Sequence, residues 1–545
     1  MRKGFKKLAI LLSFVLFISV LAACNSGEKE SSDEKGSEGN GEVSGAAMAD
    51  YGVGDQFKAS EPVTFTTLFS DHPNYPYKED WLLFEEIEKR TNVSLDATVV
   101  PMSDYAEKRS LLISSGDAPY IIPKTYPGEE SPFVASGAIL PVSDYLHLMP
   151  HFQDTVEKYG MEPYLETLRQ EDGKFYNLPG MHENVWPDYT LAVRYDILEE
   201  LGLEVPKTWD ELEVVLEEMK KAYPDSTPFS DRFKFDSTMN VAATSFGTRA
   251  GWGLGNGLKF DHDKEEFYFA PATDAHKEFV TYFHGLVEKG LLDPESVTQE
   301  DEQAVEKLIN EKSFVINTNS QTVIDYRNQL NETVGEGNFE IKKIPVPGGP
   351  LGHVMGGSKL ENGVMISSKA KDDPNFEAMM QFIDWLFYSP EGKELTKWGV
   401  EGVTYTKDAD GKRTLTEDVN YVGLNPAGTK ALNVDFGFSG GNFSYGGSTE
   451  LLHSMMNEEE LEFQDAMLSN YETLLPDPPI KYDAMQLEQS TLLSTPLIDH
   501  VKQNTLKFIL GTRDLSEWDA YVKELESKGV QRFVDMANEV YNEKK

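Results

Sequence analysis

The fold is decided by the stretch VTFTTLFSDHPNYPYKEDWLLFEEIEKRTNVSLDATVV, residues 63–100. Its first seven residues, Val63 to Phe69, are mostly β-branched or aromatic and predict a strand. Asp80 to Arg90 places apolar side chains on one face and predicts a helix, and Val93 to Val100 predicts a second strand. A helix at about 104–115 and a short buried strand at 120–122 are expected next. This alternation indicates βαβ units around a largely parallel sheet, the α/β class of fold.

The same pattern returns in the middle of the chain and gives way to helices at its end. Thr208 and Glu211 have the spacing of a capping box at the start of a helix. Asp274 is expected to cap a second helix, which Gly290 closes. Further strands are expected at 313–317, 339–345 and 363–367, and further helices at 300–311 and 374–388. Few strand signals follow residue 436, which predicts a helical C-terminal extension.

Composition limits the classes of function. The chain has 545 residues, with 50 Lys and Arg against 92 Asp and Glu, which gives a formal net charge of −42. An apolar content of 39% is enough for packed cores and excludes wholesale disorder. The acidic excess disfavours nucleic acid as a partner, because binding to it depends on Lys and Arg side chains that neutralise phosphates. It equally disfavours an electrostatic hold on anionic lipid.

The single cysteine, Cys24, excludes an intramolecular disulfide and any cysteine-based zinc or iron–sulfur site. It also ends an N-terminus that has the pattern of a secretory signal. A basic start is followed by the apolar run Leu8 to Leu21, which is too short to span a bilayer as a helix. The run ends in Leu21-Ala22-Ala23-Cys24, which resembles the bacterial lipobox, where the cysteine is lipidated and becomes the mature N-terminus.

We therefore expect a lipoprotein signal peptide at 1–23 and a lipidated Cys24. A disordered tether, rich in Ser, Gly and Glu, is expected over 24–57. The alternative is a plain signal peptide that happens to contain a cysteine.

Several stretches of the remaining chain resemble the family 1 extracellular solute-binding proteins. They are RYDILEELGLEVPKTWDEL at 194–212, LVEKGLLDPE at 286–295, AMMQFIDWLFYSPEG at 378–392, WGVEGVTY at 398–405 and WDAYVKEL at 518–525. Each stretch could serve packing alone, so the resemblance depends on their order and spacing behind a lipobox and a tether. It is strongest to the long lipoprotein branch of the family, which is associated with oligosaccharide uptake in Gram-positive bacteria.

The resemblance implies a two-lobed clamshell of type II, in which each lobe is a mostly parallel sheet flanked by helices. It places the N-terminal lobe at 58–176 and 318–366 and the C-terminal lobe at 177–317 and 367–545, with crossings near 177, 317 and 367. It implies a lipid-anchored protein on the extracellular face of the cell membrane that captures an oligosaccharide between its lobes. The protein would deliver the sugar to the permease subunits of an ABC importer, as a monomer and without catalysis.

Open α/β sheets bind ligands beyond the carboxyl ends of their strands, and a sugar needs flat apolar faces together with convergent polar groups. Aromatic and short polar residues in loops of this kind are therefore the expected contacts. They are Asp71, Lys124, Tyr126, Trp186, Tyr189, Trp252, Asn317, Asn319, Trp398 and Glu401. Each has a purely structural alternative, such as a turn, a helix cap or a packed core side chain. Trp209 and Trp385 lie in apolar helices and are expected in the core.

Signals for metal binding and for catalysis are weak. Some long relatives carry a calcium loop, but Tyr223 to Asp231 lacks the required order of Asp, Asn and Gly, so no cofactor is expected and calcium stays an open alternative. A surface glycoside hydrolase or polysaccharide lyase is the second hypothesis, because two carboxylates suffice for glycoside hydrolysis. A structural surface protein is the third. An acidic sugar would require basic residues such as Arg194 or Arg249 at the site, which slightly favours a neutral ligand.

Overall fold

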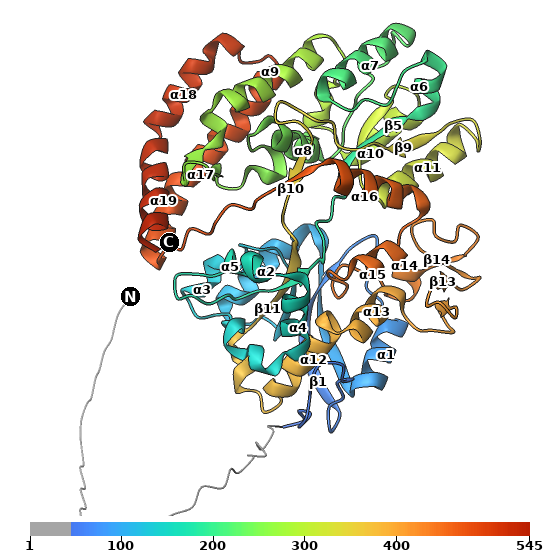
Figure 1. Cartoon of the computed structure of the whole chain (residues 1–545), viewed down its shortest axis with the longest axis vertical. Helices are drawn as coiled ribbons and strands as arrows, with labels where there is room; N and C mark the ends of the chain where they lie inside the picture. The colour runs from blue at the N-terminus through green and yellow to red at the C-terminus, as the bar shows by residue number, and fades with distance from the viewer. Residues whose placement is uncertain (1–44, 545) are drawn as a thin grey trace, which may run out of the picture. The chain divides into compact units, whose positions relative to one another are not determined.

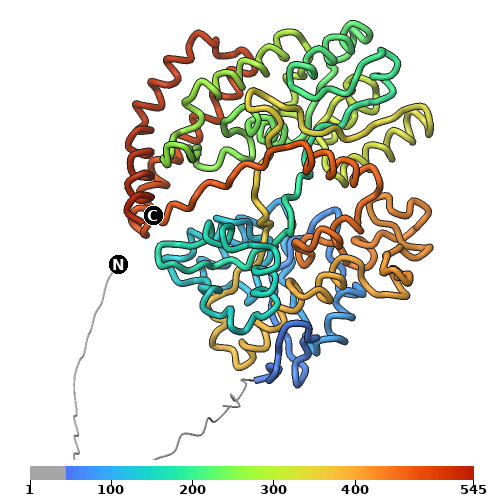
Figure 2. The backbone as a smooth tube through the Cα atoms, in the orientation of Figure 1, coloured from blue at the N-terminus to red at the C-terminus, as the bar shows by residue number. Residues whose placement is uncertain are grey.

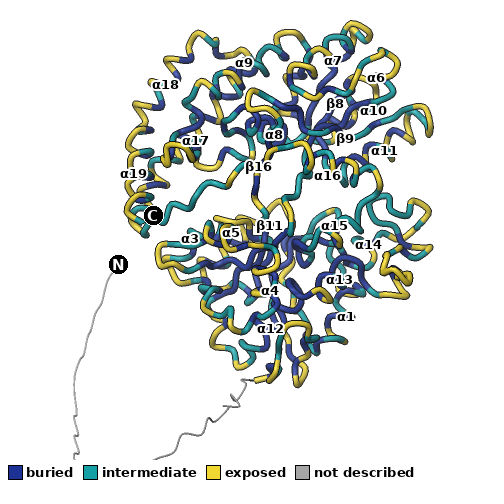
Figure 3. Tube along the Cα trace, viewed as in Figure 1, coloured by how far each residue is buried: buried dark blue, intermediate teal, exposed yellow. Residues whose placement is uncertain are grey.

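The computed structural model describes residues 45–544, and Cys24 and the expected signal peptide lie outside them. The described residues form two lobes, each around its own main hydrophobic core (Figure 1). We call residues 45–181 and 360–454 the N-terminal lobe, and residues 190–343 and 458–544 the C-terminal lobe. Within both lobes, the exposed residues lie mainly on helices and loops, and the sheets are largely buried (Figure 3).

The N-terminal lobe contains a five-stranded sheet in the order β2-β1-β3-β11-β4. Its strands are β1 (Val63–Asp71), β2 (Val93–Pro101), β3 (Ile121–Thr125), β4 (Leu178–Met181) and β11 (Leu360–Ile366). Strand β1 runs parallel to β2 and β3, and β11 is antiparallel to β3 and β4. The mostly parallel sheet predicted from residues 63–122 is therefore confirmed, and β1 to β3 present their carboxyl ends at one edge.

Helices and short hairpins surround this sheet. The helices are α1 (Leu82–Thr91), α2 (Tyr105–Ser115), α3 (Ser131–Val134), α4 (Pro150–Tyr159), α5 (Glu162–Glu166), α12 (Phe376–Tyr388), α13 (Pro390–Trp398), α14 (Leu432–Asp435) and α15 (Thr449–Ser454). Strand β12 (Tyr405–Lys407) pairs with β13 (Arg413–Leu415), and β14 (Val419–Asn420) pairs with β15 (Lys430–Ala431). Every residue of α12 from Ala378 to Tyr388 is buried, because this helix lies at the centre of the core.

The C-terminal lobe has a three-stranded sheet in the order β8-β5-β9, made of β5 (Thr190–Arg194), β8 (Val315–Thr318) and β9 (Ile341–Lys343). Strand β5 is antiparallel to both neighbours, so the expected parallel sheet is wrong for this lobe. The helix α11 (Thr322–Thr333) follows β8 and returns the chain to the same sheet at β9, on the other side of β5. Strands β8 and β9 run in the same direction, as a crossover through a helix gives, and the antiparallel pairing arises because β5 lies between them, which strand spacing alone did not reveal.

Helices make up most of the C-terminal lobe. They are α6 (Tyr195–Leu201), α7 (Trp209–Ala222), α8 (Asp236–Phe246), α9 (Asp274–Glu288), α10 (Asp301–Ile309), α16 (Glu458–Asn470), α17 (Ala484–Ile509), α18 (Trp518–Ser527) and α19 (Val530–Lys544). Strands β6 (Leu258–Asp261) and β7 (Glu266–Phe269) form a hairpin beside them. The last three helices contribute Leu497, Phe508, Tyr521 and Phe533 to the core, which confirms the helical C-terminal extension. None of the helices in the described part of the chain is both long and apolar enough to traverse a membrane.

The chain passes between the lobes three times, at 182–189, 344–359 and 455–457, as the trace shows (Figure 2). The second passage includes β10 (Val354–Gly356), which pairs with β16 (Glu472–Leu474). The boundaries expected at 317–318 and 366–367 are therefore wrong. Residues of 318–344 such as Val323 and Tyr326 pack in the C-terminal lobe, and residues of 376–451 such as Phe382 and Trp398 pack in the N-terminal core.

The tether expected over 24–57 falls partly on residues 45–57, and its earlier part lies outside the described residues. Ala46 and Phe57 are fully buried in the N-terminal core. The Tyr51 hydroxyl donates to the Asp384 carboxylate over 2.9 Å. The few apolar side chains at the end of this segment therefore anchor it to α12, and the expectation of disorder is wrong for residues 45–57.

Thr208 and Glu211 cap α7 much as the capping-box spacing predicts, but the Glu211 side chain bonds the amide of Lys207 and not that of Thr208. The Thr208 hydroxyl accepts from the Glu211 amide over 3.1 Å, as a capping box requires. The Glu211 carboxylate accepts from the amide of Lys207, one residue before the cap, over 2.7 Å. The second expected cap differs as well, because α9 is preceded by Thr273 as its N-cap residue and Asp274 is its first helical residue.

His276 makes the C-terminal lobe sensitive to acid. Its two ring nitrogens lie 3.0 Å from the hydroxyls of Thr248 and Thr505, and burial lowers its pKa to about 3. The unfolded chain therefore takes up a proton below pH 6.5 that the folded chain refuses, so stability present above pH 6.5 is lost as the pH falls. We expect His276 to account for a loss of about 2–3 kcal/mol in unfolding free energy between pH 6.5 and 4.5.

Urea unfolding at several pH values measures this loss, with H276Q as the comparison. Glutamine can bond both threonines and does not titrate, so the variant is expected to show a slope smaller by about 1.4 kcal/mol per pH unit. Equal slopes in the two proteins would contradict this assignment.

Candidate ligand-binding site

Three aromatic side chains form a partly exposed cluster on the C-terminal lobe. The ring centroid of Trp252 lies 5.2 Å from that of Tyr189 and 5.0 Å from that of Phe233, and the remaining pair is 6.2 Å apart. Trp252 is 47% exposed although its rings have close neighbours. We call Tyr189, Phe233 and Trp252 the aromatic cluster. It offers apolar ring surface to solvent at the start of β5, where the chain has just crossed from the N-terminal lobe.

Glycines hold Trp252 outward. The turn Gly251–Leu254 packs directly on α8, and a Cβ at Gly251 would lie 1.9 Å from the carbonyl oxygen of Asp236. Gly251 also has φ of +54°, a conformation that favours glycine. The backbone therefore occupies the space beside α8, and the indole is directed away from it. Trp252 was predicted to be presented by a glycine-rich loop, and the loop does hold the indole away from α8.

Phe233 was not among the predicted residues. It lies in three consecutive non-glycine residues of positive φ, Phe233, Lys234 and Phe235, with values from +51° to +69°. Such backbone is strained and occurs most often at functional sites. The Arg232 guanidinium lies 4.1 Å from the Phe233 ring centroid and is held by the Asp301 carboxylate at 2.9 Å. An aromatic residue in a polar loop between helices was the only available signal in the sequence.

Tyr189 connects the cluster to polar groups. Burial raises the pKa of Tyr189, and the Asn319 side chain lies close enough to oppose that rise. Tyr126, which follows β3 in the N-terminal lobe, is close enough to influence that pKa and is itself 54% exposed. Asn74 of the same lobe donates to the Gln321 side chain over 3.2 Å. The predicted residues Tyr126, Tyr189, Trp252 and Asn319 are thus brought together at the facing edges of the lobes.

Two other predicted residues lie at the carboxyl ends of N-terminal strands. Asp71 ends β1, but its carboxylate accepts the Tyr77 amide over 2.8 Å and so orders the following loop. Lys124 has φ of +56°, its amide donates to the Tyr445 hydroxyl over 2.9 Å, and its ammonium lies 5.7 Å from the Tyr75 ring centroid. Lys124 and Tyr75 thus form a polar corner beside Tyr126.

The other predicted contacts have structural roles. Trp398 is 1% exposed, packs in the N-terminal core and donates its indole N–H to Ser454 over 3.0 Å. Asn317 is fully buried in β8, and its amide nitrogen donates to the Thr238 hydroxyl over 3.3 Å. These two assignments to the site are wrong, because the side chains point into the lobes. Glu401 is exposed in the turn after α13, bridged to Tyr405.

Trp186 has a packing role, and Asn319 combines the role of a helix cap with a position beside Tyr189. Trp186 stacks on His182 at 5.4 Å in the first crossing segment, which matches the packing alternative. The Asn319 side-chain oxygen accepts the amides of Gln321 and Thr322 at the start of α11, as a cap does, and the same side chain lies beside Tyr189. Trp209 and Trp385 are buried in the cores, as expected.

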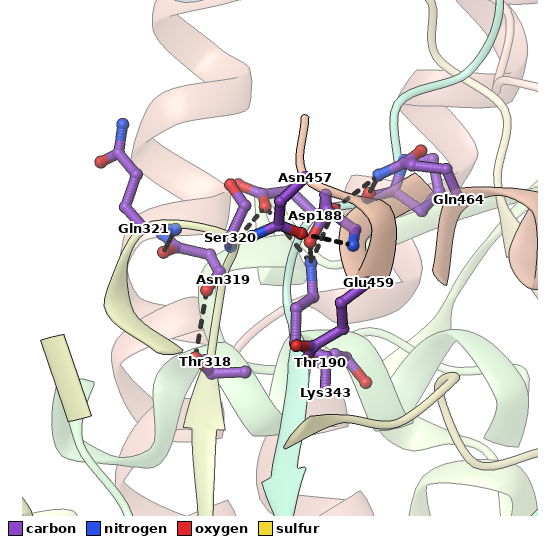
Figure 4. A network of polar contacts seen from close by, with 12 residues as sticks. Asp188, Thr190, Thr318, Asn319, Ser320, Gln321, Lys343, Asn457, Glu459 and Gln464 are labelled. Atoms are coloured by element: carbon purple, nitrogen blue, oxygen red, sulfur yellow. Dashed lines mark hydrogen bonds and ion pairs between the residues drawn. The ribbon is translucent and has the colours of Figure 1, made fainter. Parts of the chain in front are cut away.

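A polar network lies beneath this region of the C-terminal lobe and joins its crossing segments (Figure 4). Lys343 of β9 is buried and places its ammonium 2.7 Å from the carboxylate of Glu460 in α16. The same ammonium lies 3.8 Å from Asp188, which accepts the Ser320 amide over 3.0 Å. Gln464 donates to the Pro187 carbonyl over 2.6 Å. Residues at the end of the first crossing and residues that follow the third are thus fixed to the end of β9, where the second crossing begins.

Other candidate sites are poor in the described part of the chain. Within residues 45–544, no cluster of three or more His, Cys, Asp or Glu side chains is arranged to hold a metal ion. A pocket of about 630 Å³ lies on the C-terminal lobe between α7, α9 and the loop around Pro350. None of the residues lining it belongs to the aromatic cluster, and two of its aromatic residues, Trp209 and Phe246, are buried.

Comparison with known proteins identifies the class. The bacterial extracellular solute-binding protein family matches residues 74–394, and the chain belongs to this family. It is 25% identical to the fructooligosaccharide ABC transporter substrate-binding protein FusA of Streptococcus pneumoniae, over 99% of this chain and 98% of that protein. It is 22% identical to the polygalacturonan/rhamnogalacturonan-binding protein YtcQ of Bacillus subtilis, over 85% and 88% of the two chains.

The fold agrees with this assignment. The crystal structure of the alginate-binding protein AlgQ2 without calcium ion superimposes with a TM-score of 0.70 at 19% identity, covering 89% of this chain and 99% of that chain. The two-lobed clamshell of type II solute-binding proteins, expected from the sequence, is confirmed.

Proposed function

We propose that this protein captures an oligosaccharide between its lobes and delivers it to the permease subunits of an ABC importer, acting as a lipid-anchored receptor on the extracellular face of the cell membrane. The observation that carries the proposal is the aromatic cluster with Trp252 47% exposed beside the polar groups of Asn319 and Tyr126. Sugars present flat C–H faces to aromatic rings and hydroxyls to convergent polar groups, and the cluster supplies both kinds of surface.

The relatives support the same class of ligand. FusA is a fructooligosaccharide ABC transporter substrate-binding protein and YtcQ is a polygalacturonan/rhamnogalacturonan-binding protein, and both align with most of this chain. Lobes joined by three crossing segments suit a hinge that closes on a ligand, which is an established mode of binding proteins. The buried Lys343–Glu460 contact fixes the C-terminal side of this hinge. The protein is proposed to act as a monomer and without a resident cofactor.

The competing hypothesis is an enzyme that cleaves the sugar. Residues 25–545 are to be titrated calorimetrically with oligosaccharides, and the same mixtures assayed for new reducing ends and for unsaturated products. Saturable binding without products is the expected result, because the aromatic cluster presents ring surface and amide groups without a pair of facing carboxylates. Clear turnover would replace the proposal by the enzyme hypothesis.

We expect the lipid at Cys24 to be needed for transport and dispensable for binding. The anchor precedes the folded lobes, and the described contacts of the aromatic cluster join Tyr189, Phe233 and Trp252, all far along the chain from Cys24. Replacing the cysteine (C24S) should release the protein from cells and abolish sugar uptake, with an affinity within about twofold of the original. Fractionation, uptake assays and calorimetry measure the three effects. A large loss of affinity would show that the anchor shapes the site.

A further inference from the structure

Lys124 holds an ammonium without a counter-ion at the edge of the N-terminal sheet. No ion pair among residues 45–544 includes it, although the whole chain carries 92 acidic residues against 50 basic ones. Its backbone is fixed on both sides, because its amide donates to Tyr445 and its carbonyl accepts from Arg109. A lysine with this fixed, positive-φ backbone is directed by its surroundings and is not simply free to point to solvent.

The Lys124 ammonium converges with a second polar group. A Cβ on Gly441 would lie 2.8 Å from the Lys124 Nζ and 2.8 Å from the Tyr75 Oη, so both groups reach the same point above the glycine. No hydrogen bond within the described residues uses the Tyr75 hydroxyl or the Lys124 ammonium. Burial raises the pKa of Tyr75, so its hydroxyl keeps its proton and can donate. Two donors and a glycine without a side chain thus form a small cradle suited to an oxygen acceptor.

Nearby carboxylates are engaged elsewhere. Asp71 accepts the Tyr77 amide, and Glu129 pairs with Arg109 at 2.9 Å. His72 stacks on Tyr75 at 4.7 Å, and burial and the Lys124 charge both lower its pKa. The ring is therefore neutral and does not act as a counter-ion to Lys124.

Two buried lysines of the N-terminal lobe lie beside the loop Gly440–Gly447. Lys397 donates to the Ser444 hydroxyl over 3.1 Å, and the Lys393 ammonium lies 3.5 Å from the Tyr445 carbonyl oxygen. Both lysines are buried, and Glu361 is the carboxylate that acts on them, with a pKa lowered to about 2 chiefly through His182 and Lys397 against the opposing effect of burial. Burial lowers the pKa of Lys393 to about 7 and also lowers that of Lys397, so these two lysines add less positive charge than their number suggests, and the cradle depends on the Lys124 ammonium itself.

We propose that the oligosaccharide contains a uronic acid and that its carboxylate binds in the cradle of Lys124 and Tyr75. The inference rests on the proposed function and names the class of sugar. The sequence suggested Arg194 and Arg249 as partners for a sugar carboxylate, but both already form ion pairs within the protein. Arg194 pairs with Asp196 at 2.6 Å, and Arg249 pairs with Asp477. The expectation of a neutral ligand depended on those arginines, and Lys124 takes their place.

The test uses sugars that differ only in charge. Oligogalacturonates, oligoglucuronates and alginate oligosaccharides are titrated into residues 25–545, each beside its methyl-esterified form. We expect at least one acid to bind tenfold or more tightly than its ester, with a ratio that falls as salt is added. K124Q should reduce that ratio by about tenfold, and K124R should retain most of it.

Lys108 provides a matched control, because it is exposed on α2 of the same lobe and K108Q makes the same change in net charge. K108Q is expected to leave the ratio unchanged. Equal affinity for acid and ester, binding restricted to neutral sugars, or equal effects of K108Q and K124Q would overturn the inference and leave the proposed function standing. Failure of every acidic and neutral oligosaccharide to bind would overturn the proposed function and the inference with it.

Discussion

Replacing Lys343 by methionine is expected to lower the unfolding free energy of this protein by about 3–5 kcal/mol. Its ammonium lies 2.7 and 2.9 Å from the two carboxylate oxygens of Glu460, and both side chains are almost fully buried. Burial raises the pKa of Glu460, and the lysine charge opposes that rise. K343M removes the compensating charge and leaves a buried carboxylate with Gln464 as its remaining partner.

The double variant separates charge from packing. K343M/E460L removes both members of the buried pair, and the partly exposed Asp188 keeps its hydrogen bond from the Ser320 amide. Apolar pairs of similar volume are often as stable as the ion pairs they replace. We therefore expect the double variant to recover most of the loss, measured by urea unfolding. If both proteins are equally destabilised, the lysine acts through its contact with the Phe463 ring, whose centroid lies 3.9 Å from the ammonium, and the ion-pair account is wrong.

Replacing Trp252 by alanine is expected to weaken sugar binding by about 30-fold, which corresponds to about 2 kcal/mol. The indole is half exposed and contacts Tyr189 and Phe233, so it contributes more to a ligand's surroundings than to the core. W252A should therefore leave the thermal midpoint nearly unchanged. Calorimetric titration measures the loss of affinity and thermal unfolding measures the stability.

W252F is the matched variant for this prediction. Phenylalanine keeps a flat apolar face and should retain affinity within about fivefold. V214A provides a control, because Val214 is an exposed apolar residue on α7 and is remote in the fold from the cluster. Unchanged binding by W252A would remove the aromatic cluster from the site, and a large fall in its stability would assign the indole to packing.

Local patterns predicted the elements well because they depend on residues close in sequence. The stretch from Val63 to Val100 gave β1, α1 and β2 within one or two residues, since side-chain alternation and helical periodicity are local properties. The passages between lobes were not predicted correctly. Strand β8 ends at Thr318 and is followed by α11 in the same lobe. No local pattern near residue 318 indicates that the chain then returns as β9 and pairs with β5.

The site was predicted in part for a similar reason. Trp252 and Trp398 are both followed by glycine, yet Trp252 lies in a short turn on the surface and Trp398 ends a helix whose apolar face is buried. The helical spacing before Trp398 was a usable signal. Asn317 was misassigned because β8 is buried on both sides, and Phe233 was missed because its exposure depends on an unusual backbone that sequence does not display.

The structure changes what the acidic composition implies about the charge of the ligand. A net charge of −42 disfavoured nucleic acid as a partner and slightly favoured a neutral sugar. Lys124, however, places an ammonium without an ion pair among the described residues beside the Tyr75 hydroxyl, at the edge of the N-terminal sheet. A ligand responds mainly to charges within about a Debye length, so this ammonium acts on it more strongly than the distant acidic surface does.

A crystal structure of residues 25–545 with the tightest-binding oligosaccharide tests the central claim most directly. The account predicts a sugar ring stacked on Trp252 or Tyr189, hydroxyls bonded to Asn319, and further contacts with Tyr126 or Lys124 across the lobes. A sugar bound in the pocket between α7 and α9, or anywhere else that leaves the aromatic cluster in solvent, would contradict it.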